Sequence, residues 1–170
     1  MISAQTISYS EEKIFYVSAG QIIIKQNEGV LYSTPLGSCI AVVSYDTKSK
    51  TGGMAHIMLP GKSPRVGKYA NKYAFNGINT LIKKLTAAGA KTDSLQTCLI
   101  GGANVLKKEN DIIAKQLTDS VLKIIAETKL IITASSLGGY ERRTAKLHLN
   151  SGIVTFTVGN GFEKVLYKFL

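Results

Sequence analysis

Cys39 and His56 are the residues of this sequence whose types and spacing could carry out nucleophilic chemistry. Each stands in an apolar segment rich in β-forming residues, and a short polar turn joins the two segments. This arrangement predicts neighbouring strands, on which a thiol and an imidazole can lie side by side. An imidazole that accepts a thiol proton leaves a thiolate, which can attack an amide carbonyl. Taken singly, each residue is also compatible with an inert place in the core; a thiol beside an imidazole is the minimum that nucleophilic attack on an amide requires.

The sequence around this pair has a recognisable pattern. It reads LGSC at 36–39 and GGMAHIMLP at 52–60, followed by a helix beginning GKYA, IGGANV at 100–105 and LGGYERR at 137–143. Together these motifs resemble the CheD family of chemoreceptor glutamine deamidases. The resemblance implies hydrolysis of receptor glutamine side chains to glutamate with release of ammonia. It implies Cys39 as the nucleophile, His56 as general base and later general acid, and no metal or organic cofactor.

A third group is expected to fix the orientation and tautomer of the His56 imidazole. The resemblance implies a hydroxyl six residues before the cysteine, where this chain has Ser33 in place of the family's threonine. Thr34 is the alternative if the strand register differs, because Pro35 can distort the strand. Spacing favours Ser33.

The substrate carbonyl would develop negative charge in a tetrahedral intermediate, and backbone N–H groups can stabilise that charge. Gly37 has no Cβ and lets the backbone approach a substrate closely. The backbone N–H groups of Ser38 and Cys39 are therefore the expected oxyanion donors.

The other residues with chemical potential fit structural roles. Cys98 lies in the apolar run TCLI and predicts an unreactive core thiol. The glycine pairs 52–53 and 101–102 lack phosphate-loop spacing and predict turns or close packing. Arg142 and Arg143 fit either a substrate-facing loop or a solvated strand end. The cysteine and histidine spacings resemble no zinc site, so neither a metal nor a cofactor is expected.

The composition indicates the class of protein. A chain of 170 residues that is 45% hydrophobic fits one domain with a substantial core. No apolar run reaches the length of about 18 residues that a membrane helix needs. Residues 1–12 are polar, lack the pattern of a secretory signal, and predict a loose extension before a single CheD-like cysteine hydrolase domain at 13–170. Two cysteines do not form a disulfide framework, so a cytoplasmic location is expected.

The charge balance bears on partners. The chain has 21 Lys and Arg against 11 Asp and Glu, a formal net charge of +10, which favours an anionic partner. The basic residues form no long run and no nucleic-acid motif is recognisable, so nucleic acid is not expected. An acidic protein fits better. The resemblance implies the cytoplasmic helices of chemoreceptors, with a CheC-type phosphatase as a further candidate partner.

The elements that must position the pair follow from hydrophobic periodicity. Strands are predicted at 13–26 in one or two pieces, and at 30–34, 36–46, 51–59, 95–100, 129–135, 143–149, 153–158 and 164–169, with helices at 69–85 and 113–125. The first strands follow one another in antiparallel order. The pattern predicts an α+β fold with mixed, largely antiparallel sheets. Two main helices would cover one face, which agrees with the three-layer α/β/β sandwich that the resemblance implies.

Two alternatives share this fold. One is a non-catalytic chemotaxis adaptor that docks on receptors or on a CheC-type phosphatase. The other keeps the thiol chemistry but acts by transglutamination or on glutamines outside chemotaxis, as toxins of the cytotoxic necrotizing factor type resemble CheD in fold.

Overall fold

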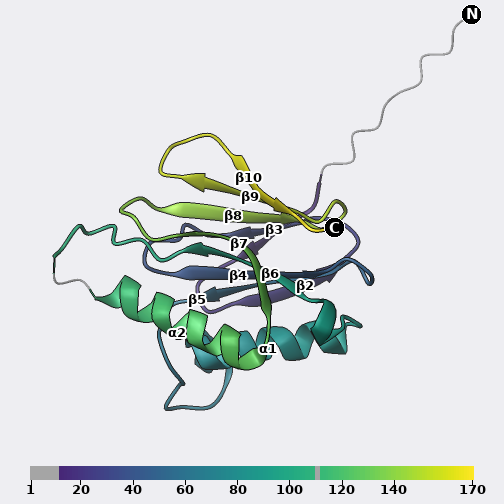
Figure 1. Cartoon of the computed structure of the whole chain (residues 1–170), viewed down its shortest axis with the longest axis horizontal. Helices are drawn as coiled ribbons and strands as arrows, with labels where there is room; N and C mark the ends of the chain where they lie inside the picture. Colours follow the sequence, from purple (N-terminus) through teal and green to yellow (C-terminus); the bar gives the residue numbers. More distant parts are fainter. Residues whose placement is uncertain (1–11, 110–111) are drawn as a thin grey trace, which may run out of the picture.

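The computed structural model describes residues 12–109 and 112–170, and this part of the chain forms three layers (Figure 1). The predicted extension at 1–12 lies outside the described residues except for Glu12, which is exposed. The bounds of the elements are β1 Ile14–Val17, β2 Ile22–Gln26, β3 Val30–Ser33, β4 Ile40–Asp46, β5 Thr51–Ile57, α1 Ala74–Ala87, β6 Gln96–Gly101, α2 Ile113–Thr128, β7 Ile131–Leu137, β8 Arg143–His148, β9 Ile153–Val158 and β10 Lys164–Lys168. Short 3₁₀ turns occupy Lys68–Lys72 and Thr92–Ser94.

The layers are one pair of helices and two five-stranded sheets. The middle sheet has the strand order β2-β5-β4-β6-β7, and the outer sheet has the order β1-β3-β8-β9-β10. Only the β1–β3 and β6–β7 pairings are parallel among the described strands, and α2 is the crossover between β6 and β7. Helices α1 and α2 lie on the face of the middle sheet that points away from the outer sheet (Figure 1). The predicted α/β/β sandwich is thereby confirmed.

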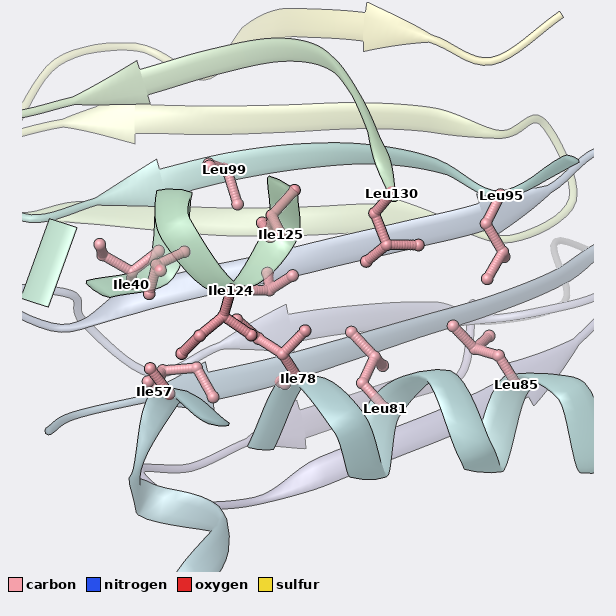
Figure 2. Close-up of a cluster of buried hydrophobic side chains, with 14 of the residues drawn as sticks. Ile40, Ile57, Ile78, Leu81, Leu85, Leu95, Leu99, Ile124, Ile125 and Leu130 are labelled. Carbon is pink, nitrogen blue, oxygen red and sulfur yellow. The ribbon is translucent and has the colours of Figure 1, made fainter. Parts of the chain in front are cut away.

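The central strands of the middle sheet, β4, β5 and β6, are buried on both faces, which explains the apolar runs around Cys39 and His56. Alternate residues of β4 point to opposite sides: Ile40 packs under the helices, and Ala41 packs between the sheets. Figure 2 shows the helix-side cluster, in which Ile57 of β5 lies near Ile78 of α1. Strands covered on both faces read as continuous hydrophobic segments rather than as alternating ones. The candidate pair therefore belongs to the most deeply buried layer.

The differences from the predicted elements are local. Helix α1 begins at Ala74 rather than at 69, because the chain first makes the 3₁₀ turn Lys68–Lys72. Gly89 follows the C-cap residue Ala88 with φ +98°, in the C′ position where a left-handed glycine ends a helix. The described residues form ten strands, because the segment predicted at 13–26 in one or two pieces is two strands, β1 and β2. None of their helices is long and apolar enough to cross a membrane.

Candidate active site

Strand register places Cys39 and His56 on the same face of the middle sheet. Ala41 of β4 lies directly opposite His56 of β5. Cys39 comes just before β4 and stands two residues from Ala41, so its side chain shares the inter-sheet face, where it packs against the core cluster. Diagonal neighbours in an antiparallel pair lie roughly 7–8 Å apart at their Cα atoms, within reach of long side chains. The structure therefore brings the predicted thiol and imidazole to one end of one hairpin.

The His56 imidazole is held by a backbone carbonyl. The side chain is 1% exposed, and Nδ1 lies 3.2 Å from the carbonyl oxygen of Val17 and 3.4 Å from Oγ1 of Thr34. A carbonyl oxygen can only accept, so a bond to Val17 requires the proton on Nδ1. In the neutral ring Nε2 then carries the lone pair. Nε2 is buried and makes no hydrogen bond to any residue that the structure describes. The nitrogen that is left free is the one able to take a thiol proton.

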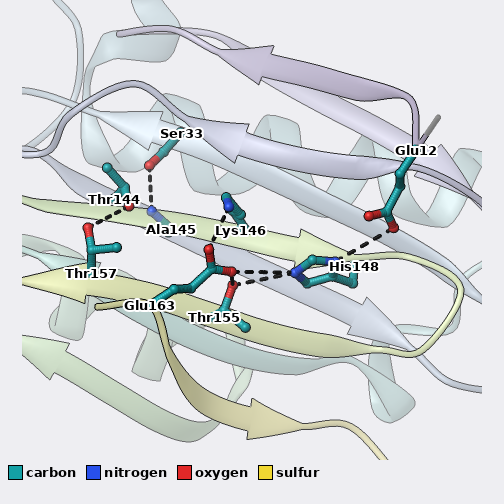
Figure 3. A network of polar contacts seen from close by, with 9 residues as sticks. All are labelled: Glu12, Ser33, Thr144, Ala145, Lys146, His148, Thr155, Thr157 and Glu163. Atoms are coloured by element: carbon teal, nitrogen blue, oxygen red, sulfur yellow. Dashed lines mark hydrogen bonds and ion pairs between the residues drawn. The ribbon is translucent and has the colours of Figure 1, made fainter. Parts of the chain in front are cut away.

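Ser33 does not contact the imidazole. Its buried Oγ accepts a hydrogen bond of 2.8 Å from the backbone N–H of Ala145 in β8 (Figure 3). Tyr32 is the last β3 residue that pairs with β8, opposite Lys146. The Ser33 hydroxyl therefore accepts the hydrogen bond of the first β8 amide beyond that pairing. Thr34 is the residue whose hydroxyl reaches His56. The structure thus brings Thr34, the alternative to Ser33, within 3.4 Å of the imidazole.

Burial disfavours the charged form of both members of the pair. Desolvation lowers the pKa of His56, and the hydrogen bond with Val17 opposes this only partly. Desolvation also raises the pKa of the Cys39 thiol, against a smaller lowering by its own backbone amide. Both shifts therefore favour an uncharged thiol and an uncharged imidazole over a thiolate–imidazolium ion pair.

The backbone around Cys39 is fixed by the glycine turn that ends β6. The N–H of Gly102 donates to the Cys39 carbonyl at 2.9 Å, and the N–H of Ala103 donates to the Gly37 carbonyl at 2.9 Å. Gly101 has φ +124°, and a Cβ there would stand 2.1 Å from the Cys39 carbonyl oxygen. This confirms the close packing predicted for the glycine pair. The backbone N–H groups of Ser38 and Cys39 donate to no backbone carbonyl of the described residues.

Arg143 matches neither of its predicted roles. Its buried guanidinium donates from Nε to Ser136 Oγ at 2.9 Å and from Nη1 to the Gly138 carbonyl at 2.7 Å. Its backbone also exchanges two hydrogen bonds with Leu36, next to the Cys39 loop. Arg143 thus ties the loop after β7 to the segment that leads into Cys39. The period-two burial of β8 puts Arg143 on the same face as Ala145, and this alternation is the signal in the sequence that could have found the buried cation.

The remaining thiol and imidazole lie apart from the pair. Cys98 is fully buried, and desolvation raises its pKa to about 11, as expected of an unreactive core thiol. His148 belongs to the outer sheet, where it lies near Glu12 and Glu163 (Figure 3). Among the described residues, no group of three or more His, Cys, Asp or Glu side chains is placed to hold a metal ion.

Known proteins are similar in sequence to this chain over most of its length. The family model described as CheD chemotactic sensory transduction matches residues 58–158, a range that begins just after His56. The probable chemoreceptor glutamine deamidase CheD of Chlorobium luteolum is 41% identical over 143 residues, covering 82% of this chain and 70% of its own. The chemoreceptor glutamine deamidase CheD of Thermotoga maritima is 31% identical over 149 residues, covering 85% and 92%. A probable deamidase of the same name from Methanococcus vannielii is 34% identical over 134 residues, covering 78% and 87%. Matches of this identity and coverage show that the chain belongs to the CheD family.

Proposed function

We propose that this protein deamidates glutamine side chains of chemoreceptors, with Cys39 as nucleophile and His56 as general base. The names of the relatives support the reaction and its substrate. One observation carries the assignment of residues: a buried imidazole with Nδ1 held by the Val17 carbonyl and Nε2 unbonded, on the sheet face that also bears Cys39. The proposal includes a cytoplasmic location and a CheC-type phosphatase as a further partner.

The chemistry would proceed through a thioester. His56 Nε2 accepts the Cys39 proton, and the sulfur attacks the glutamine carboxamide carbon. The backbone N–H groups of Ser38 and Cys39 donate to the oxyanion of the tetrahedral intermediate. The imidazolium then gives its proton to the departing ammonia. A water molecule, deprotonated by His56, hydrolyses the thioester to glutamate and restores the thiol, so that one water is consumed for each ammonia released.

The direct test is to incubate the protein with the cytoplasmic fragment of a chemoreceptor from the same organism. Mass spectrometry of the digested fragment is expected to find Gln-to-Glu conversion at defined positions, with a matching release of ammonia. A fragment that binds the protein but keeps every glutamine would support the adaptor instead.

Thr34 and Ser33 are expected to respond differently to removal of their hydroxyls. Thr34→Val keeps the shape of the side chain and removes the contact with His56 Nδ1, so kcat/KM should fall several-fold, roughly 3- to 10-fold, since Val17 still holds the ring. Ser33→Ala leaves the buried Ala145 N–H without its acceptor and should cost about 1–3 kcal/mol of unfolding free energy. Urea unfolding and steady-state kinetics of both variants separate the two roles. A larger kinetic loss in Ser33→Ala than in Thr34→Val would restore Ser33 as the orienting group.

The neutral resting pair predicts how Cys39 reactivity depends on pH. Because burial raises the pKa of this thiol, the thiolate fraction below that pKa should grow about tenfold per pH unit. The rate of Cys39 alkylation by iodoacetamide should therefore climb throughout the neutral and mildly alkaline range. An ion pair would instead give a plateau of high reactivity reaching into acid, and such a plateau would contradict the neutral pair. Peptide mapping distinguishes Cys39 from the buried Cys98.

A further inference from the structure

The positive charge of this chain is concentrated in one stretch that follows β4. Residues 47–92 contain nine Lys and Arg and no Asp or Glu, whereas the rest of the chain has 12 basic and 11 acidic residues. Nearly all of the net charge of +10 therefore comes from these 46 residues. A search for runs of basic residues does not find this stretch, because its Lys and Arg residues are spaced apart. What distinguishes the stretch is that it contains no Asp or Glu.

Part of this stretch lies against the end of β5 that bears His56. The carbonyl of Lys72 accepts hydrogen bonds of 2.9 Å from the backbone N–H groups of Met58 and Leu59. The aliphatic stem of Lys72 covers Gly20, where a Cβ would meet its Cγ at 2.6 Å, and the Gly20 N–H donates to the His56 carbonyl at 2.8 Å. The backbone that carries Lys72 is thus fixed within a few residues of the candidate base.

The lysines here form the rim of a cavity. A hollow of about 480 Å³ is lined by Lys68, Tyr69 and Lys72 and by Ile22 and Ile23 of the edge strand β2. Both ammonium groups lie over the Tyr69 ring, at 5.4 and 5.6 Å from its centroid. Tyr69 is 69% exposed. Neither lysine forms an ion pair with a carboxylate among the described residues.

The segment that carries these side chains is held by its own hydrogen bonds. The N–H of Gly61 donates to Ser120 Oγ at 2.8 Å, the N–H of Ser63 donates to Asn76 Oδ1 at 2.8 Å, and Thr80 donates to Asn71 Oδ1 at 3.0 Å. The lysines are therefore presented from a fixed backbone.

We propose that the Lys68–Tyr69–Lys72 cavity binds a carboxylate-bearing segment of the protein substrate and so brings the neighbouring glutamine to Cys39. This surface is called the basic cavity below. The inference rests on the proposed function for the identity of the substrate. The occupant is an acidic stretch of the glutamine-bearing chain. Its carboxylates supply the negative charge that no described carboxylate gives the two lysines, and its aliphatic carbons can pack against the part of the lining that β2 provides. Unpaired lysines beside an aromatic ring gain most from a carboxylate that replaces the water around them.

The inference makes charge near the glutamine a determinant of which glutamines are modified. A glutamine with Asp or Glu close to it on the substrate surface should be deamidated faster than one without. Each exposed ion pair contributes little in water, so the effect should come from several charges and should weaken as salt screens them.

The test measures binding separately from chemistry. Binding is measured with the Cys39→Ala variant in place of wild type, because this variant should not convert the substrate. The binding of a labelled chemoreceptor cytoplasmic fragment is followed by fluorescence anisotropy at low and high salt. Adding Lys68→Glu and Lys72→Glu should weaken binding at least about tenfold at low salt and flatten its salt dependence. The matched control adds Lys48→Glu and Lys50→Glu, which change the same charge at the β4–β5 turn, at the far end of the hairpin. The control should bind within about twofold of Cys39→Ala.

Further measurements separate the alternatives. With Cys39 intact, the Lys68→Glu/Lys72→Glu variant should react with iodoacetamide at the wild-type rate, which shows that the site is still folded. A receptor fragment in which the Asp and Glu residues near the glutamines are changed to Asn and Gln should bind Cys39→Ala and its Lys68→Glu/Lys72→Glu derivative equally.

Equal weakening by both double variants, or no weakening by Lys68→Glu/Lys72→Glu, would overturn the basic cavity as the docking site. Tighter binding of a DNA oligonucleotide than of the fragment, lost in the same variant, would overturn the protein partner. Binding that behaves as expected without any Gln-to-Glu conversion by wild type would refute the deamidase alone.

Discussion

Cys39→Ala is expected to abolish glutamine deamidation, lowering kcat/KM by at least about 10³-fold, since the sulfur forms the covalent bond of the proposed thioester. His56→Gln should cause a loss of similar size, because the proposed mechanism uses the unbonded Nε2 to take the thiol proton and to return it to ammonia. The double variant should be little worse than either single variant, as expected of two groups that act as one unit. Ammonia release and Gln-to-Glu conversion on the receptor fragment measure all three variants.

The control for Cys39→Ala is Cys98→Ala. It removes the second thiol, which is fully buried in the inter-sheet core and has a pKa of about 11. It should lose some stability through the cavity that it leaves, yet keep activity within about threefold of wild type in the folded fraction. Full activity in Cys39→Ala, or its loss in Cys98→Ala alone, would contradict the assignment of the nucleophile.

Gly101→Ala is expected to be the most damaging substitution outside the catalytic pair. The new Cβ would stand 2.1 Å from the Cys39 carbonyl oxygen, and φ at this position is +124°, where side chains are strained. The obstructing atom is backbone in the central layer and cannot rotate away. The unfolding free energy should fall by about 3 kcal/mol or more, near the upper range for single substitutions. Because the carbonyl of Cys39 must move, the rate at which iodoacetamide alkylates Cys39 in the folded fraction should also differ from the wild-type rate.

Gly89→Ala is the matched control for Gly101→Ala. Gly89 also has a positive φ of +98°, but nothing lies within 4 Å of the position that a Cβ would take. It should therefore show the backbone strain alone, about 1–2 kcal/mol, with unchanged Cys39 reactivity. Urea unfolding of both variants gives the comparison. Equal losses in the two would mean that contact with Cys39 contributes nothing.

Much of the fold could be predicted from the sequence because its signals are local. The period of the apolar residues marks both helices, and Gly89 ends α1 where a left-handed residue is needed. The turn between β4 and β5 joins two apolar segments, and this pairing is what carries Cys39 and His56 to one end of a hairpin. These features depend on neighbours a few residues apart. The start of α1 was misplaced because a 3₁₀ turn and a helix share similar spacing over so short a stretch.

By itself, the sequence determined which residues could do the chemistry and which strands would carry them. Only the tertiary structure decided what surrounds the imidazole. The Thr34 hydroxyl rather than that of Ser33 lies near the ring, and the Val17 carbonyl sets its tautomer. Both contacts arise because β1 and β3 pair in the outer sheet and their ends lie against β5 of the middle sheet. Such contacts join segments far apart in the chain, and the facing of each side chain reverses with a one-residue shift of register. The charge near the site is also a matter of tertiary structure, since the packing of Lys72 on Gly20 is what sets it beside the strand of His56.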